Sequence, residues 1–534
     1  MWDTQGPWSR SPSSSCAHWA SSARRSCWGA VFGLVVLRPW LTGVADASVL
    51  RRHVVRLVRA GGLFLLAAQV AALLLILSSV VDGPAWPLAD FLATPLAQAS
   101  GLRVAAGLAA LGAAAWIARR PRADGPWLAL LAAGVAAAGT AAWTSHATAR
   151  LHGREALLAV DVLHQLASAV WGGGLVHLIV LVLARGDVAW PAGALRAFSR
   201  VARVAVAALG ASGLLLALVY VGGPGALIGT AYGGMLLAKT ALVIGLLALG
   251  AANFRAVRRL PPTRTMLPVR LGRFVEVEAG LAVTLVFVAA SLGSAPPGVD
   301  IVRDRATAAE IAARFAPRWP AFSTPSFTEL ASAAAIDDPL APRTAADIAW
   351  SEYNHNVAGA FVLFIGILAA LHRLAGVAWA RHWPLVFLAL SAFLLLRTDP
   401  NAWPLSPTQT FWGSLVDPEI LQHRALALLP AALGLFEWLV LEGRLAAPGW
   451  ARVAPLLMAV GGGLLLAHAH PLVGVKESYL MEVTHLPLGL LGVLIGWTRW
   501  LELRLPAADR RIPARIWPPA LALVGLLLVL YREG

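Results

Sequence analysis

Histidine is the residue type whose number and placement point to chemistry in this chain. The 534 residues include 13 histidines but only 2 cysteines and 5 methionines. Imidazole nitrogens with an occasional thioether and no thiolate favour copper, with zinc and iron as alternatives. The candidate metal ligands are His146, His164, His355, His423, His468, His470, Glu482 and His485.

Local spacing groups several of these residues. Glu482 and His485 are three residues apart and share a face if the segment is helical. In His468-Ala-His470 an extended backbone would place both imidazoles on one side. Each pair also occurs by chance, and histidine suits helix ends near lipid headgroups. The prediction of a metal site therefore depends on the whole pattern and not on one pair.

A carboxylate precedes one of the histidines by about one helical turn. Asp161 lies three residues before His164. A carboxylate at this spacing can hold one ring nitrogen and so orient the other toward a metal. We therefore expect Asp161 to position His164.

A second set of residues lies within apolar segments and could line a path across the membrane: Trp171, His177, Tyr232 and Lys239. Ionisable groups inside membrane spans are costly, so they indicate function by default. Alternatively, Lys239 extends outward past Tyr232 to reach water. Glu276 and Glu278 lie near a cytoplasmic helix end, where we expect each carboxylate to be solvated or paired with an arginine.

The elements that position these residues are long apolar helices. The chain is 58% hydrophobic and 13% charged, with a mean hydropathy of +0.70. This composition excludes a soluble enzyme, a disordered regulator and a nucleic-acid-binding domain, despite the net charge of +15. The apolar runs do not alternate as membrane strands do, so the sequence predicts an all-α polytopic membrane protein with about 13–14 transmembrane helices.

The predicted spans lie near 60–81, 102–118, 126–143, 157–184, 200–221, 232–252, 274–293, 354–372, 383–396, 420–441, 453–468, 481–501 and 516–532, with a weaker run at 29–44. Arginines concentrate in alternate loops, near 51–59, 119–122, 185–203, 255–273, 373–381, 444–452 and 499–515. Arginine-rich loops stay in the cytoplasm. The eight candidate ligands then lie at the opposite, non-cytoplasmic surface.

Four segments follow from this division. Residues 1–28 form a tail, predicted to be disordered, that contains both cysteines, and 29–293 form a first transmembrane domain. Residues 294–353 form a proline-rich linker outside the membrane, with a short helix expected around Ala306–Phe315. Residues 354–534 form a second transmembrane domain.

The first transmembrane domain carries the marks of a known family. Phe198–Arg259 contains an FSR entry, a mid-helix Ser-Gly, the turn and helix GTAYGGMLLAK and an asparagine–arginine exit. With Ser-His-Ala at 145–147 and LHQLASAVWGGGL at 163–175, it resembles the copper resistance protein D (CopD/PcoD) family over about 29–293. The second half, with YNHN at 353–356, PEILQHR at 418–424, HAHP at 468–471 and the run at 476–505, resembles the extension of large CopD-type proteins.

The resemblance implies a multi-pass protein of the bacterial inner membrane that imports copper from the periplasm, which would make the 294–353 linker periplasmic. It also implies a periplasmic copper-binding partner of the CopC type, which would be a separate protein because the sequence has no CopC-like β-domain. The partners expected are thus the lipid bilayer and this protein, with no nucleic acid. The cargo is a copper ion, and the protein is not expected to be an enzyme.

Two alternatives stay open at this stage. The first is an electron-transfer protein with b-type haem, held by axial histidines from different helices. The second is a copper-delivery factor for a cuproenzyme, without net transport. The sequence has no GxxxxGK[ST] motif, so transport would be passive or coupled to an ion.

Overall fold

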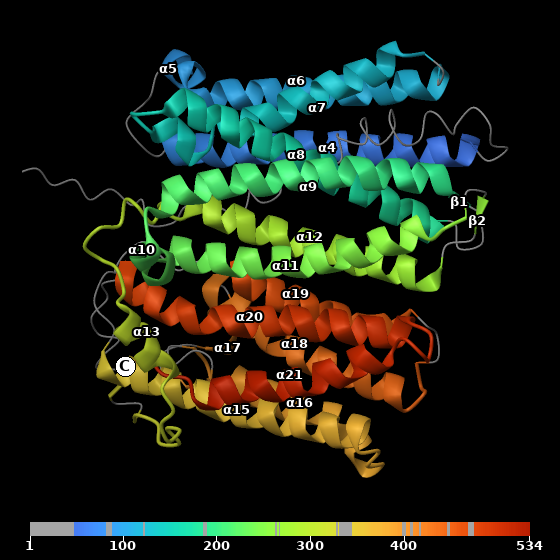
Figure 1. The fold of residues 1–534 in the computed structure, drawn as a ribbon. Helices are drawn as coiled ribbons and strands as arrows, with labels where there is room; N and C mark the ends of the chain where they lie inside the picture. Colours follow the sequence, from blue (N-terminus) through green and yellow to red (C-terminus); the bar gives the residue numbers. More distant parts are fainter. Residues whose placement is uncertain are drawn as a thin grey trace, which may run out of the picture. The chain divides into compact units, whose positions relative to one another are not determined.

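A computed structural model shows an almost entirely helical protein (Figure 1). It describes residues 47–81, 88–120, 123–184, 190–261, 264–265, 268–326, 329–330, 344–397, 402–405, 410–415, 418–445, 449–467 and 475–533. In these residues, 13 helices are long and apolar enough to cross a membrane. The predicted polytopic all-α fold is confirmed.

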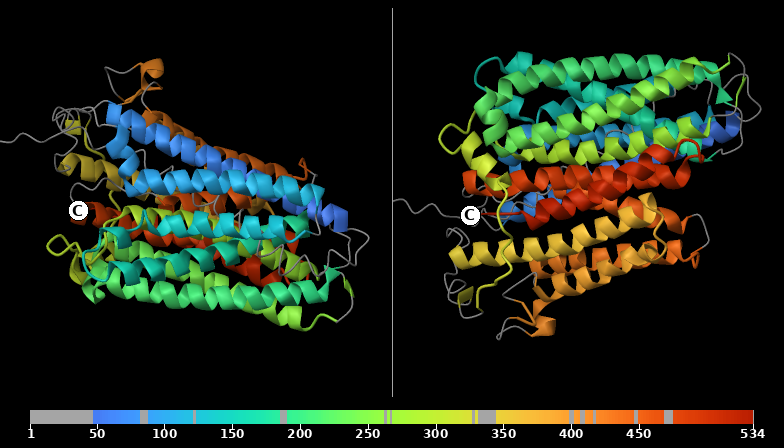
Figure 2. Two further views of the ribbon diagram at one scale, coloured as in Figure 1. Left: turned by 90° about the horizontal axis from the view of Figure 1, so that it is seen from above. Right: turned by 60° about the horizontal axis from the view of Figure 1, so that its bottom comes forward.

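The chain divides into two compact units. Unit 1 comprises the described residues of Met1–Pro224 and Lys239–Ile301. Its helices are α4 (Ala47–Val81), α5 (Leu88–Ala93), α6 (Pro95–Arg119), α7 (Gly125–Ala142), the 3-10 turn η2 (His146–Ala149), α8 (Arg154–Ala184), α9 (Ala192–Val221), most of α11 (Ala231–Arg258) and α12 (Val269–Ser294). The long helices of this unit run side by side, as Figures 1 and 2 show from different directions.

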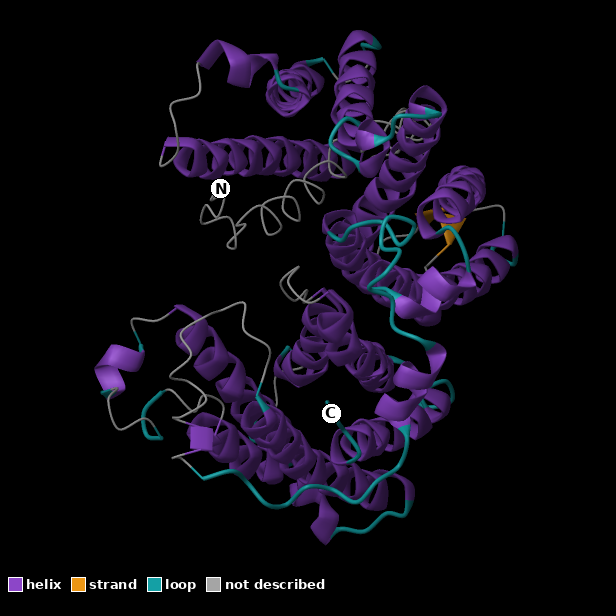
Figure 3. Ribbon diagram, turned by 90° about the vertical axis from the view of Figure 1, so that its left-hand side faces the viewer, coloured by secondary structure: helices purple, strands orange, loops and turns teal. Residues whose placement is uncertain are grey.

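Unit 2 comprises the described residues of Gly225–Ala238 and Val302–Gly534. It contains α10 (Pro224–Gly229) from its second residue, the first residues of α11, α13 (Ala308–Phe315), α15 (Ala345–Leu374), η3 (Trp379–Leu385), α16 (Val386–Arg397), α17 (Phe411–Ser414), α18 (Pro418–Leu441), η4 (Trp450–Arg452), α19 (Val453–Ala467), α20 (Val475–Arg504) and α21 (Arg511–Val529). Figure 3 shows the same helices from another side, coloured by secondary structure.

The strands in the described residues are two short ones. Strand β1 (Trp190–Pro191) pairs antiparallel with β2 (Arg264–Thr265), so that Trp190 lies opposite Thr265. This pair joins two loops of unit 1 at the end opposite α5 (Figure 1).

Small residues let helices of unit 2 approach closely. A Cβ atom built on Gly359 of α15 would lie 2.3 Å from the backbone nitrogen of Val529 at the end of α21. A Cβ atom on Gly525 would lie 2.1 Å from the nitrogen of Leu363. Such approaches stabilise helix pairs in lipid, where burial of apolar surface gives little driving force. The contact at Gly359 also brings the chain after α21 to the turn of α15 that carries His355.

The observed helices are longer than the apolar runs that predicted them. Helix α4 begins at Ala47 and α15 at Ala345, in polar sequence ahead of the runs at 60–81 and 354–372. Hydropathy detects the lipid-facing part of a helix, whereas a cap such as Thr344, bonded to Asp347, sets its beginning. The predicted helix near Ala306–Phe315 is confirmed as α13, with a capping box between Thr307 and Glu310. The run at 29–44 and the tail at 1–28 lie outside the described residues.

Candidate metal-binding histidines

His164 of unit 1 is held by a serine from the neighbouring helix. Its Nδ1 atom on α8 lies 3.1 Å from the hydroxyl oxygen of Ser212 on α9. The Ser212 hydroxyl donates its own proton to the carbonyl of Ala208 at 2.6 Å, so it accepts from His164 Nδ1–H. The proton therefore resides on Nδ1, and Nε2 carries the lone pair that a metal would use.

The residue after this serine makes room for the imidazole. A Cβ atom on Gly213 would lie 3.1 Å from Cε1 of His164. Glycine at this position lets the ring lie against the backbone of α9. The Ser-Gly pair singled out in the sequence is thus shaped around His164: one residue sets the tautomer and the other accommodates the ring.

The predicted role of Asp161 is wrong. Asp161 is buried, and its carboxylate accepts a hydrogen bond from Gln165 at 3.2 Å. The Gln165 amide, four residues along the same helix, is thus the partner of Asp161, and the partner of His164 comes from α9. Spacing within one helix could not reveal a partner that comes from another.

Lys239, predicted as a path residue, belongs to the surroundings of His164. It lies on α11, half-buried, and interacts electrostatically with the imidazole. A predicted capture residue and a predicted path residue thus interact with each other. The cation would repel a metal ion bound to His164, and this repulsion increases with the charge of the metal ion.

His146 lies in the turn η2 between α7 and α8. Its ring centre is 5.8 Å from that of Tyr220, in an edge-on arrangement. Arg150 of the same turn forms an ion pair with Asp300 at 2.8 Å. Burial lowers the pKa of His146 and the charge of Arg150 adds to this effect, while a hydrogen bond with the Leu292 backbone opposes it. The carboxylates of Asp300 and Asp161 also oppose the lowering, but the net effect is a pKa of His146 below the usual histidine value.

In unit 2 the structure brings together two predicted ligands from distant helices. His355 on α15 and His485 on α20 have ring centres 5.8 Å apart at an interplanar angle of 82°. The ring of Tyr531, just beyond α21, stacks on His355 at 4.0 Å and lies 5.7 Å from His485. Three aromatic rings from three segments thus form one cluster.

Both histidines of this cluster have the same tautomer. His355 Nδ1 is 2.8 Å from the carbonyl oxygen of Ser351, and His485 Nδ1 is 2.8 Å from that of Met481. A carbonyl only accepts, so each Nδ1 carries the proton and each Nε2 carries a lone pair. This backing by a backbone carbonyl is the usual state of a metal-ligating histidine.

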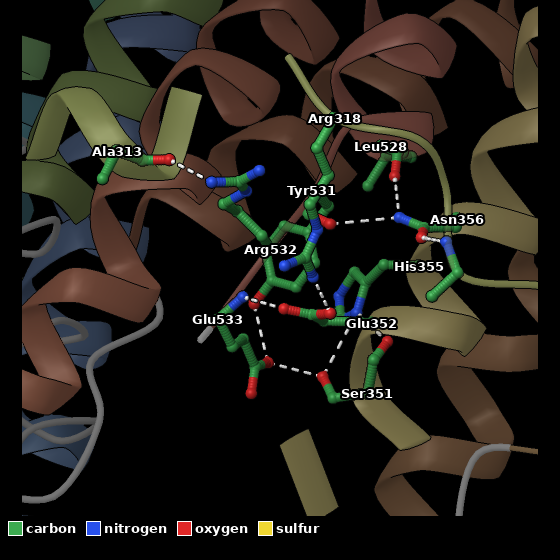
Figure 4. A network of polar contacts seen from close by, with 11 residues as sticks. Ala313, Arg318, Ser351, Glu352, His355, Asn356, Leu528, Tyr531, Arg532 and Glu533 are labelled. Carbon is green, nitrogen blue, oxygen red and sulfur yellow. Dashed lines mark hydrogen bonds and ion pairs between the residues drawn. The ribbon is translucent and has the colours of Figure 1, made fainter. Parts of the chain in front are cut away.

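A polar network supports the cluster (Figure 4). The carboxylate of Glu533 accepts hydrogen bonds from the hydroxyls of Tyr531, at 2.7 Å, and Ser351. Its backbone nitrogen donates to Glu352 at 2.9 Å, and Glu352 pairs with Arg318. Both carboxylates are satisfied, so they fix Tyr531 and the beginning of α15 in place. Sequence reasoning missed Tyr531 and Glu533 because nothing local links them to a histidine.

The remaining predicted ligands are not assembled into one larger site. His423 lies near the beginning of α18, and Glu482 lies one turn before His485 on α20. His468 and His470 lie outside the described residues. Within the described part of the chain, no three histidine, cysteine, aspartate or glutamate side chains lie close enough together to hold a metal.

The predicted path residues differ in their surroundings. Trp171 and His177 of α8 are buried, and His177 Nδ1 donates to the carbonyl of Gly173 at 2.7 Å. Tyr232, near the beginning of α11, is also buried. Trp171 hydrogen-bonds to the carboxylate of Glu278.

Glu278 is a buried carboxylate, whereas the sequence predicted that water or arginine would be its partner. Its Oε2 accepts from the Asn253 amide at 2.7 Å, and neither this partner nor Trp171 is charged. Glu276 does pair with Arg273, as expected. Oδ1 of Asn253 is buried and has no hydrogen-bond partner among the described residues. The signal was available, because Glu278 lies nine residues into the apolar helix α12.

Thirteen apolar helices of membrane-spanning length, with His177, Asp161 and Glu278 buried among them, define a polytopic membrane protein. Residues 192–292 match the family model of copper resistance protein D. The chain is also similar to the copper transport protein CutJ of Bacillus subtilis (strain 168), with 28% identity over 177 residues. The similarity to copper resistance protein D thus lies in the segment that begins with α9 and ends in α12.

The similarity covers only part of each protein. The alignment spans 32% of this chain and 31% of the CutJ chain. No solved structure matches. The matched segment 192–292 contains Ser212, Gly213, Lys239, Asn253 and Glu278, so most residues that surround His164 or the buried carboxylate lie within it.

Proposed function

We propose that this protein imports copper across the bacterial inner membrane and that His164 binds the ion on the way in. The observation that carries the proposal is the construction of the Ser212-Gly213 pair around His164. This pair lies within the segment that matches the copper resistance family. It holds the proton of His164 on Nδ1 and so leaves the lone pair on Nε2.

Electrostatics favours monovalent copper at this point. The cation Lys239 interacts with His164, and its repulsion of a bound ion doubles when the ion carries two charges instead of one. Imidazole is a suitable ligand for copper in either state. We therefore assign Cu(I) as the ion that passes His164.

Direction and partner follow from the charge distribution of the loops. With arginine-rich loops on the cytoplasmic side, His146 and the half of α8 that carries His164 would lie toward the opposite surface. Copper would reach that surface bound to a separate periplasmic carrier of the CopC type. His146, whose pKa is lowered chiefly by burial, would receive the ion near the entrance.

Copper uptake by a copper-depleted host tests the proposal. His164→Ala should raise the external copper concentration needed for half-maximal uptake by about 10-fold or more, because a ligand is lost. His152→Ala is the matched control, since His152 is exposed in the same outer loop region. Uptake that is equal in the two variants, at equal protein level, contradicts the proposal. A haem absorption band in the purified protein would instead support electron transfer.

A further inference from the structure

We propose that His355 and His485 together bind one monovalent copper ion in unit 2, at a site separate from His164. The assignment of copper rests on the proposed function. The existence of a metal site rests on the geometry of the histidine pair. The site lies outside the segment that matches the family model, which ends at residue 292.

The distance between the two imidazoles fits a shared ion. The nitrogen–metal bond of a histidine is about 2.0 Å long, and the ring centre lies about 1.1 Å behind the nitrogen. Two imidazoles bound to one ion therefore have ring centres about 5 Å apart when the nitrogen–metal–nitrogen angle is tetrahedral and about 6 Å apart when it is linear. The observed separation of 5.8 Å falls within this interval.

The ligand atoms are already in the required state. Nδ1 of each ring donates to a carbonyl of its own helix, Ser351 for His355 and Met481 for His485. Two helices that are distant in sequence thus present the same nitrogen, Nε2, in its unprotonated form. A carbonyl bond at Nδ1 also occurs at His177 and His372, so what distinguishes His355 and His485 is the pairing of their rings at 5.8 Å.

Neighbouring residues fix one ring before any ion binds. Tyr531 stacks on His355 at 4.0 Å, and its hydroxyl is anchored on Glu533 at 2.7 Å (Figure 4). Glu533 in turn accepts from Ser351, on the same turn of α15. A ligand whose orientation is set in advance loses less entropy on binding.

The small number of ligands selects the ion. Protein zinc sites use four ligands, or three with an open position. The described residues offer no third histidine, cysteine or carboxylate in ligand position. Monovalent copper is stable with two nitrogen ligands in a near-linear arrangement. A neutral bis-imidazole site therefore favours Cu(I) over Zn(II).

Titration of the tag-free, full-length protein with Cu(I), against a competing chelator under reducing conditions, tests this site. We expect His355→Phe and His485→Phe each to lower the copper stoichiometry by one equivalent and the double variant to lower it no further. Phenylalanine keeps the ring that packs on Tyr531 and removes the nitrogen. X-ray absorption of a His164→Ala protein should show two imidazoles on the remaining copper.

The matched control is His372→Phe. His372 lies on the same helix α15, and its Nδ1 also bonds a backbone carbonyl, that of Val377 at 3.4 Å. This variant should keep the full copper stoichiometry. Unchanged stoichiometry in the His355→Phe/His485→Phe double variant, with wild-type thermal unfolding, overturns the proposal, as does preferential binding of Zn(II) at this pair. Neither result affects the transport function, which His164→Ala tests separately.

Discussion

Ser212 accepts a hydrogen bond from Nδ1 of His164 at 3.1 Å while donating its own proton to the Ala208 carbonyl. The hydroxyl therefore links a histidine of α8 to the backbone of α9 and leaves only one tautomer. A polar pair within two apolar helices is satisfied internally, as lipid requires. The same bond leaves Nε2 as the nitrogen that carries the lone pair.

Removal of this hydroxyl should weaken copper binding without loss of the ligand. We expect Ser212→Ala to lower copper affinity about 10-fold, the lower end of the effect of residues that orient metal ligands. Competition titration of the purified protein measures it. Ser294→Ala is the control, because Ser294 makes the same kind of bond to the carbonyl four residues earlier. Equal affinity of the two variants would refute the orienting role of Ser212.

The space beside His164 gives a second prediction on the same helix. A Cβ at position 213 would lie 3.1 Å from the imidazole, whereas a Cβ at position 210 would meet nothing within 4 Å. Gly213→Ala should therefore displace the ring and raise the copper concentration for half-maximal uptake. Gly210→Ala should leave uptake unchanged and slightly stabilise α9. Identical uptake in both variants would contradict the placement of the ring.

The spans could be predicted from the sequence because apolar length is a local property. Every span predicted between 60 and 532 corresponds to one of the observed membrane-length helices. Helix ends could not be predicted equally well, since polar turns such as that after Thr344 continue a helix beyond its apolar part. Caps and neighbouring helices decide those ends.

The residues of the sites could be predicted only one by one. His355 and His485 were candidates, but their pairing depends on the packing of α15 and α20. Tyr531 carries no motif and reaches the site because Gly359 lets α21 approach. Asp161 was assigned to His164 by spacing, yet the partner came from another helix. Tertiary contacts of this kind leave no periodic signal.

Glu278 should matter for stability through its two neutral partners. Glu278→Ala would leave Asn253 and Trp171 without the acceptor they share, and we expect a loss of about 1–3 kcal/mol for the buried donors. Glu278→Gln keeps an acceptor oxygen and should lose less. Thermal unfolding in detergent compares the two variants. If the glutamine variant is destabilised as much as the alanine variant, the stability of α11 and α12 depends on the negative charge of Glu278 and not on its hydrogen bonds.

Membrane orientation can be measured with single cysteines. We expect His152→Cys to react with an impermeant thiol reagent in intact spheroplasts and Arg259→Cys to react only after lysis, because arginine-rich loops stay in the cytoplasm. Both positions are exposed. The native Cys16 and Cys27 must first be changed to serine. The opposite labelling pattern would reverse the direction of transport proposed above.

The ion pair between Glu310 of α13 and Lys476 of α20, at 2.5 Å, gives a prediction that depends on pH. Hydrogen bonds from Lys476 and then Thr307 lower the pKa of Glu310 to about 2. A carboxyl with a lowered folded-state pKa stabilises the fold above its ordinary pKa of about 4.3 and loses this contribution as pH falls through the folded value. At pH 5, residues 306–316 should thus be better protected from hydrogen exchange in the wild-type protein than in the Glu310→Gln variant. This difference should shrink between about pH 4 and pH 2. Asp304→Asn is the control, since Asp304 is an exposed acid in the same segment. A difference that is already absent at pH 5 would mean that the ion pair does not hold α13 against α20.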